Sequence, residues 1–332
     1  MSSLLIPEDY ESKLDIKETN KAINLIDNFF EQGVLSELDL IKFIQPLFSV
    51  HEEVSDENND NNLIFKIKGC NNEFKPLNNF DEWIRFALTK YGFIINEGIL
   101  IDFKTIQPDS DSDNLNSAVI NKLVFEKVID KKERAKDNLK NIVDIIYNIL
   151  YKCNQLILSK YNNLIYSMPE ELTFISTMQL EEMYPDEIPE QREYLAAKEY
   201  GAVFLDEIGG MLRSGQPHEI TEPDYSDWEL NGKILLYYDL IDVVLNVASI
   251  SVKVDSNSLN RQLIISGKQE RSVLPYQKAV LSNELSQSIG GHINKDLIYM
   301  LFLEKAHIGE ISLSWWNRDI AEICKENNIK FL

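Results

Sequence analysis

The sequence has few cysteines, no long apolar run and a deficit of basic residues. The three cysteines, Cys70, Cys153 and Cys324, form no CxxC pair, which argues against a disulfide framework or a zinc site and predicts free thiols. No apolar run approaches the roughly 20 residues that a membrane helix needs. The N-terminus lacks the basic region and apolar run of a signal peptide, so we expect a cytoplasmic protein.

The charge of the chain is strongly negative. Its 33 Lys and Arg residues face 54 Asp and Glu residues, which gives a formal net charge of −21 at pH 7. A chain this acidic is repelled by phosphate backbones and anionic lipids, so we expect neither nucleic acid nor membrane as a partner. A local basic pocket can still lie within the acidic total. No metal-ligand spacing links the four histidines, His51, His218, His292 and His307.

The distribution of apolar residues predicts an α+β protein. Length and composition fit one globular domain over residues 1–332. Helical spacing predicts helices at 10–33, 80–91, 131–160, 189–200, 256–266, 275–285 and 297–305. Strand patterns fall at 38–49, 63–68, 99–104, 119–128, 172–175, 202–205, 233–238, 249–254 and 310–315. The polar stretches 51–62 and 107–116 predict loops. We expect a mainly antiparallel sheet with helices on one side.

Several strings rich in glycine and aromatic residues occur in order along the chain. They include KEYGAVFL at 198–205, EPDYSDW at 222–228, QSIGGHI at 287–293 and AHIGE at 306–310. Together with KYGF at 90–93 and FEKV at 125–128, they resemble asparagine synthetase A, the aspartate–ammonia ligase family built on a class II aminoacyl-tRNA synthetase core. The resemblance covers essentially the whole chain. It implies a homodimer in which ATP and Mg²⁺ activate aspartate as an acyl-adenylate that ammonia attacks.

At several positions where the resemblance implies charged groups, this chain holds other residues. The resemblance implies two acids on the metal side, but the chain has Lys233 and Asn246 there. It implies arginines where the chain has Lys253 and Leu297, and lysine lacks the planar two-pronged donor of arginine. The other changed positions, which the resemblance assigns to substrate or phosphate contacts, are Glu82, Gln107, Lys122, Val124 and Thr221.

These substitutions lead us to expect that no catalytic residue is retained. On this interpretation the chain has lost ligase activity and acts as a binding or regulatory protein, as a homodimer or as a mixed dimer with an active paralog. It would need no cofactor and no metal. The introduced lysines would suit a small anionic or amino-acid ligand. The candidate ligand-binding residues are Arg85, Lys122, Asp224, Asp227, Lys233, Ser249, Lys253, Gly290, Gly291 and His292.

The alternative is an active enzyme, either a divergent aspartate–ammonia ligase or a related adenylating ligase with another substrate. ATP and Mg²⁺ would then be required. The residues that survive for such a role are Asp224, Asp227, Ser249, Gly290 and Gly291. Three further acids could reach a metal, namely Glu97, Asp109 and Asp111. The expected pocket lies between Arg85, Lys122, Lys233 and Leu297; an open cavity there favours ligand binding, and a filled one favours a structural role.

Overall fold

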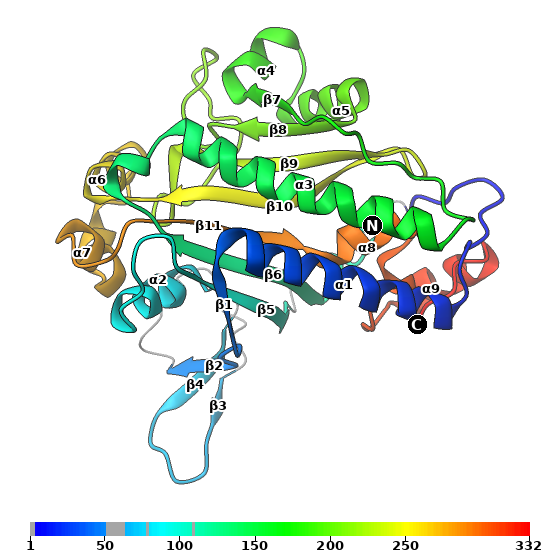
Figure 1. Ribbon diagram of the computed structural model, residues 1–332, viewed down its shortest axis with the longest axis horizontal. Coiled ribbons are helices and arrows are strands. Elements are labelled where there is room, and N and C mark those ends of the chain that lie inside the picture. The colour runs from blue at the N-terminus through cyan, green and yellow to red at the C-terminus, as the bar shows by residue number, and fades with distance from the viewer. Residues whose placement is uncertain (1–3, 51–63, 78–79, 108–109) are drawn as a thin grey trace.

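The computed structural model describes residues 4–50, 64–77, 80–107 and 110–332. Its centre is an eight-stranded sheet in the order β1-β5-β6-β11-β10-β9-β8-β7 (Figure 1). The inner strands from β5 to β9 pair antiparallel, whereas β1 with β5 and β7 with β8 pair parallel. The strands are β1 Leu40–Phe43, β5 Gly98–Ile106, β6 Val119–Val128, β7 Thr173–Ser176, β8 Ala202–Asp206, β9 Ser226–Tyr238, β10 Val243–Lys253 and β11 Ser288–Asn294.

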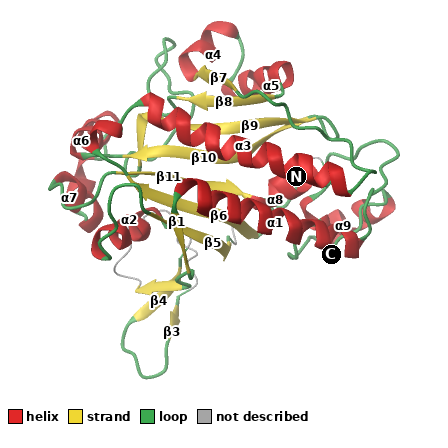
Figure 2. Ribbon diagram, in the orientation of Figure 1, coloured by secondary structure: helices red, strands yellow, loops and turns green. Residues whose placement is uncertain are grey.

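Two long helices cover one face of this sheet. Helices α1 (Ile16–Leu38) and α3 (Lys136–Lys160) contact each other and lie in front of the central strands in Figure 2. On α3 the buried residues Leu139, Ile142 and Ile146 recur at helical spacing, so one apolar stripe meets the sheet. The strand residues beneath them, such as Phe125 and Ile250, belong to the same core cluster.

The opposite face is covered only at its two sides, so the expectation of helices on one side was wrong. Helix α2 (Asp81–Lys90) packs over β5, where Ile99, Leu100 and Ile101 are buried in succession and therefore need cover on both faces. Helices α4 (Thr177–Met183) and α5 (Pro189–Tyr200) cover β7 and β8. Between these two groups, no helix of the described residues covers this face of the central sheet.

The remaining elements lie at the ends of the sheet. Helices α6 (Ser256–Ile265) and α7 (Pro275–Leu281) pack together at one end, and α8 (Lys295–Phe302) and α9 (Arg318–Glu326) lie towards the other (Figure 1). Short 3₁₀ turns are η1 Lys131–Glu133, η2 Gln269–Val273 and η3 Ile308–Glu310. A small second sheet, in the order β2-β4-β3, extends from the body; its strands are β2 Phe48–Val50, β3 Phe65–Lys66 and β4 Glu73–Pro76.

Several local predictions need correction. The strand expected at 310–315 is the end of η3 followed by irregular chain, because the backbone amide of Ile311 bonds back to Ile308 in a turn. The helices α4 and α9 and the strand β11 were not predicted as elements. The predicted loop 51–62 lies outside the described residues, and 107–116 is a loop wherever it is described. No helix within the described ranges combines the length and apolarity that crossing a membrane would require.

Candidate functional site

A row of directly opposed residues, polar on three of its four strands and called the polar row below, crosses the sheet on the face away from α1 and α3. Lys233 on β9 lies opposite Ser249 on β10, Ser249 opposite His292 on β11, and His292 opposite Val124 on β6. Directly opposed residues of antiparallel strands share a face, and so do residues two apart along a strand. The same face therefore also carries Asn231, Ser251, Lys253, Glu126 and Lys122.

Two adjoining hollows lie over this row. The first, of about 200 Å³, is lined by Lys233, Ser249 and Lys253 on the sheet and by Glu219 and Glu222 from the chain before β9. The second, of about 250 Å³, lies between α2 and strands β5 and β6 and is lined mainly by Phe80, Phe103, Lys122 and Val124. Both hollows share the residues Asp81, Gly291 and His292.

Lys253 joins the sheet to the start of α2. Its ammonium donates to the Oδ1 of Asp81 at 2.8 Å, and the side chain is almost completely buried. Burial acts to lower the pKa of Lys253, but the negative charges of Asp81 and Glu126 raise it, so the ammonium stays charged. Burial raises the pKa of Glu126, opposed by the nearby charges of Lys253 and Arg85. Lys253 therefore lies beside two acids, the buried Glu126 and the half-buried Asp81.

Lys233 holds a second cluster of acids. Its ammonium lies 3.0 Å from a carboxylate oxygen of Glu193 on α5 and 2.7 Å from one of Glu219. The Nε2 of His218 lies 2.7 Å from the same Glu193 oxygen. Neither Glu193 nor Glu219 was a sequence candidate, because nothing in the local pattern links α5 or this loop to β9. The structure thus supplies acids beside the position where the sequence had lost one.

Lys122 and His292 line the second hollow in different charge states. Burial lowers the pKa of Lys122, and within the described residues its ammonium has no hydrogen-bond or ion-pair partner. Burial, followed by the positive charge of Lys122, lowers the pKa of His292 to about 3. His292 is therefore neutral at physiological pH, and the negative charge of Asp81 partly offsets the effect of burial on the pKa of Lys122.

Other sequence candidates serve the scaffold and line neither hollow. The Oδ2 of Asp224 accepts from Arg271 at 2.6 Å, and the Oδ2 of Asp227 accepts from Arg134 at 2.8 Å. Arg85 is buried and donates to the backbone oxygen of Ser286 and to the hydroxyl of Tyr276, each at 3.2 Å. These hydrogen bonds and ion pairs connect α2, α7 and β9 with the residues that precede α3.

Gly290 and Gly291 are explained by strand packing. An added Cβ would lie 2.3 Å from the Phe125 backbone oxygen at Gly290 and 2.1 Å from the Ser249 backbone oxygen at Gly291. Both distances are too short for any side chain, because the neighbouring strands β6 and β10 approach closely. Strand packing alone therefore accounts for glycine at both positions, whether or not a ligand binds there.

The pocket expected between Arg85, Lys122, Lys233 and Leu297 does not form as one cavity. Leu297, on α8, belongs to the hydrophobic core, and Arg85 lines neither hollow but bonds to Ser286 and Tyr276. Only Lys122 and Lys233 face the hollows, each in a different one. The physical reason is that strands β10 and β11, with Ser249 and His292, separate Lys233 on β9 from Lys122 on β6.

The remaining changed positions are spread over the site and the surface. Thr221 and Asn246 line the first hollow, and the carboxylate of Glu82 accepts from the Tyr225 hydroxyl at 3.3 Å. Gln107 is exposed at the end of β5. Of the three acids considered as metal ligands, Glu97 accepts from the backbone of Ile94 in its own turn, Asp111 is exposed, and Asp109 lies outside the described residues.

A protein-held Mg²⁺ does not fit the donor set of this face. In the described part of the chain, no group of three or more His, Cys, Asp or Glu side chains could hold a metal ion. The acids over the polar row are paired with lysines: Asp81 with Lys253, and Glu193 and Glu219 with Lys233. A cation already occupies the position that a metal would take, so we derive no step through a metal held by these residues.

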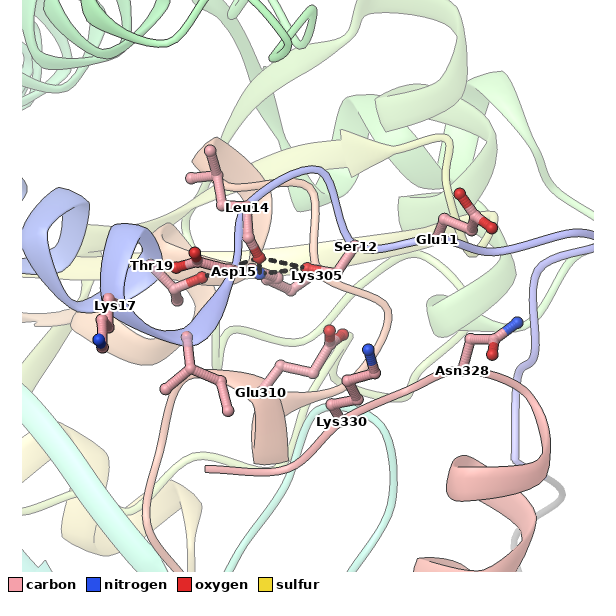
Figure 3. Close-up of a pocket in the computed structure, with 11 residues that line it drawn as sticks. Glu11, Ser12, Leu14, Asp15, Lys17, Thr19, Lys305, Glu310, Asn328 and Lys330 are labelled. Carbon is pink, nitrogen blue, oxygen red and sulfur yellow. Dashed lines mark hydrogen bonds between the residues drawn. The ribbon is translucent and has the colours of Figure 1, made fainter.

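A third hollow lies at the N-terminal end of α1, away from the polar row. It measures about 610 Å³ (Figure 3). The buried ammonium of Lys305 donates to the Oγ of Ser12 at 2.6 Å and to the backbone oxygen of Leu14 at 3.2 Å, while Glu310 accepts from Tyr10. These bonds attach the N-terminal segment to the C-terminal part of the chain, which is a structural role.

Comparison with known proteins gives close relatives over the full length. The family model described as aspartate–ammonia ligase matches residues 17–328. The aspartate–ammonia ligase of Fusobacterium nucleatum is 39% identical over 97% of this chain and 99% of its own. That of Clostridium perfringens strain SM101 is 39% identical over 100% of both chains, and that of Levilactobacillus brevis is 35% identical over 99% of both.

Solved structures with the same fold are class II aminoacyl-tRNA synthetases. Asparaginyl-tRNA synthetase from Pyrococcus horikoshii, complexed with asparaginyl-adenylate, matches with a TM-score of 0.63 at 11% identity, covering 90% of this chain and 68% of that one. Aspartyl-tRNA synthetase from Entamoeba histolytica matches with a TM-score of 0.61 at 10% identity, covering 91% and 58%. At such identities the similarity is one of fold, and it confirms the expected class II synthetase-like α+β core.

Proposed function

The chain belongs to the aspartate–ammonia ligase family, and on that premise we propose that it is an ATP-dependent ligase that forms asparagine from aspartate and ammonia. One observation carries the proposal: relatives bearing the ligase name are 35% to 39% identical over essentially the full length of both chains. We place the activity in the cytoplasm, since all three cysteines are free thiols.

The interpretation of the chain as a protein that has lost ligase activity was wrong. The finding that overturns it is the full-length similarity to proteins named as aspartate–ammonia ligases. The physical reason for the error is that comparing single positions ignores charged groups brought in by other elements. Glu193 and Glu219, from α5 and the chain before β9, lie beside Lys233, where the sequence had lost an acid.

The proposed reaction has two steps. The carboxylate of the aspartate side chain attacks the α-phosphate of ATP, so an acyl-adenylate forms and pyrophosphate leaves. Ammonia then attacks the acyl carbon, AMP leaves, and the nitrogen loses a proton to give the amide. A neighbour in fold, the Pyrococcus horikoshii synthetase, is complexed with asparaginyl-adenylate, which is an intermediate of the same chemical type.

We assign the nucleotide phosphates to the first hollow. Lys233 and Lys253 line it with two ammonium groups, and Ser249, which lies opposite Lys233, lines it as well. Preorganised donors of this kind stabilise the charge that develops on a transferring phosphoryl group. The second hollow adjoins the first through Asp81, Gly291 and His292 and is large enough for a four-carbon acid. We place aspartate there.

The direct test is to incubate the purified protein with ATP, aspartate and an ammonium salt. We expect asparagine, AMP and pyrophosphate in equal amounts, with asparagine absent when ammonium is left out. Amino-acid analysis and a coupled pyrophosphate assay measure the products. A folded protein that yields no asparagine above the blank would contradict the proposal.

A lysine variant tests the assignment of the first hollow. Lys233→Met removes one ammonium from its floor, and we expect kcat/KM to fall about 100-fold, the usual cost of losing one such donor. Lys198→Met is the matched control, since Lys198 is exposed on α5 and pairs with Asp242, outside both hollows. Equal activities of the two variants would refute the assignment. Circular dichroism checks that both are folded.

We also propose that the protein forms a homodimer. The segment that contains β1 runs along the edge of the large sheet, and Ile41 and Ile44 are exposed on it, as is Leu47 just beyond. An uncovered edge strand with a row of apolar side chains is a surface that soluble proteins usually bury against a partner.

A further inference from the structure

The first hollow carries more acids than cations. In the described part of the chain its charged lining side chains are Lys233 and Lys253, against Asp81, Glu219 and Glu222. Like charges repel strongly at short range in a partly enclosed site. The nucleotide phosphates assigned to this hollow therefore require one of the three carboxylates to withdraw when they bind.

Two of the three acids are held in place. Glu222 accepts from Lys268 at 2.8 Å and from Arg271 at 2.7 Å, and neither of these cations lines the hollow. Burial acts to raise the pKa of Glu222, but the two cations lower it, so their charge offsets its own. Asp81 is the first residue of α2, and it accepts at 2.8 Å from Lys253, which is almost completely buried.

Glu219 is the acid with room to move. Its side chain is 53% exposed, compared with 43% and 32% for the other two acids. It lies in the short stretch 219–222 between the buried residues His218 and Pro223, so the side chain can turn towards solvent while the chain on either side stays fixed. Its ion pair is with Lys233, at 2.7 Å, and an ion pair with so exposed a partner contributes little.

Lys233 keeps a second counter-ion when Glu219 leaves. Its ammonium lies 3.0 Å from an oxygen of Glu193, and the Nε2 of the buried His218 lies 2.7 Å from the same oxygen. Burial acts to raise the pKa of Glu193, but His218 and Lys233 lower it, so the carboxylate stays ionised. This fixed partner on α5 holds the ammonium in place, and the side where Glu219 lies is left to an entering anion.

We propose that Glu219 is a built-in competitor of the nucleotide. Its carboxylate occupies the position beside Lys233 that a phosphate of ATP takes, and it turns out of the first hollow when ATP binds, while Glu193 stays. The exchange replaces one anion by another at the same ammonium and leaves two lysines against two acids in the lining. It depends on the proposed function only in placing the phosphates in this hollow.

Glu219→Gln tests the proposal, because it keeps the shape of the side chain and removes its charge. In buffer without divalent cations we expect the Kd for ATP, measured by isothermal titration, to fall at least threefold, since no ion pair has to be broken. Inorganic pyrophosphate should show the same gain, and adenosine, which has no phosphate, should bind both proteins equally. Unchanged or weaker ATP binding, no heat with ATP, or an equal gain for adenosine would overturn the proposal.

Glu229→Gln is the matched control. Glu229 is a glutamate on β9 with a side chain that is 68% exposed; it pairs with Arg261 and lines neither hollow. We expect its Kd for ATP to equal that of wild type. A gain as large as that of Glu219→Gln would show that any loss of negative charge from this acidic chain tightens ATP, which would refute the competition. Thermal unfolding checks that both variants are folded.

A crystal structure of the complex with ATP gives a readout that does not depend on affinity. We expect the Glu219 carboxylate to lie beyond the roughly 4 Å of an ion pair from the Lys233 ammonium, with a phosphate oxygen in its place. Glu193 should remain paired with Lys233. Glu219 still paired with Lys233 in that complex would contradict the exchange.

The outcomes separate this proposal from the ligase activity. If Glu219→Gln tightens ATP but no asparagine forms from aspartate, ammonia and ATP, the ligase proposal fails and the exchange stands. If asparagine forms but the variant binds ATP no more tightly than wild type, the ligase proposal stands and the exchange fails.

Discussion

At the scale of single residues, Asp296 at the start of α8 should make stability depend on pH. Burial raises the pKa of Asp296 to about 6, although Asn121 donates to it at 3.0 Å. The folded protein therefore keeps this proton up to about pH 6, whereas the unfolded chain loses it near the ordinary value of about 4. Between these values the native state binds more protons, so the contribution of Asp296 to stability is lost as pH rises.

Asp296→Asn should remove this dependence. The new amide keeps the bond from Asn121 and can donate to the Oδ1 of Asn121, which is buried and has no partner among the described residues. We expect the free energy of unfolding to rise relative to wild type by about 1 kcal/mol more at pH 7.5 than at pH 5. Urea denaturation at both pH values measures it, and a difference that does not change with pH would contradict the prediction.

The strand residues of the site were predictable from the sequence, but the groups that pair with them were not. Lys122, Lys233, Lys253, Ser249 and His292 were all candidates, and strand alternation places them on one face of the sheet. Their partners were not predictable, because Asp81, Glu193 and Glu219 come from α2, α5 and a loop whose positions depend on tertiary packing. The changed positions therefore suggested that charged groups had been lost, whereas the structure shows lysine–carboxylate pairs at Lys233 and Lys253.

At the scale of elements, Arg134 joins four segments at one end of the sheet. It precedes α3, pairs with Asp227 on β9 at 2.8 Å and with Asp255, the N-cap of α6, at 3.5 Å. It also donates to the backbone oxygen of Lys253 at the end of β10 and to Gln287 before β11. Arg134→Met would leave Asp227 buried beside a neutral side chain, and we expect a loss of roughly 3–5 kcal/mol in the free energy of unfolding.

Arg261→Met is the control, because Arg261 pairs with the same Asp227 from a more exposed position. Its guanidinium lies 3.5 Å from Asp227 and 2.9 Å from Glu229, and 43% of its side chain is exposed. Exposed pairs of this kind contribute at most about 1 kcal/mol. Chemical denaturation of both variants measures the two losses. Similar losses would mean that Arg134 does not join these segments as described.

Elements were predictable where turn residues or a run of strand-forming residues set their bounds. α5 and β6 match their predicted bounds, since Pro189 opens the helix, Gly201 ends it, and β6 is rich in β-branched and aromatic residues. β11 was missed because Gly290 and Gly291 give it no strand signal of their own. The alternation after 310 indicated a strand, but Glu310 instead accepts from the backbone of Ala306, which favours a turn. A hydrogen bond between a backbone amide and a side-chain carboxylate, as at Glu310, is hard to predict from sequence periodicity.

At the scale of the whole molecule, the proposed dimer must form against repulsion between two chains of net charge −21. Salt screens such repulsion, with a Debye length of about 30 Å at 0.01 M and about 8 Å at 0.15 M. An association driven by apolar contact should therefore tighten as salt rises. We expect the dissociation constant of the dimer to be lower in 150 mM than in 10 mM NaCl, measured by sedimentation equilibrium.

Ile44→Asp tests whether the edge beside β1 is the dimer surface. Ile44 is 94% exposed, and the neighbouring Gln45 bonds to the backbone of Lys104 on β5, which fixes this segment along the edge. A carboxylate at the centre of an apolar interface would be buried without a partner, so we expect dimer affinity to fall at least tenfold. Ile165→Asp is the matched control, because Ile165 is 75% exposed on the chain after α3. A wild-type monomer, or equal association of the two variants, would show that the edge does not mediate dimerisation.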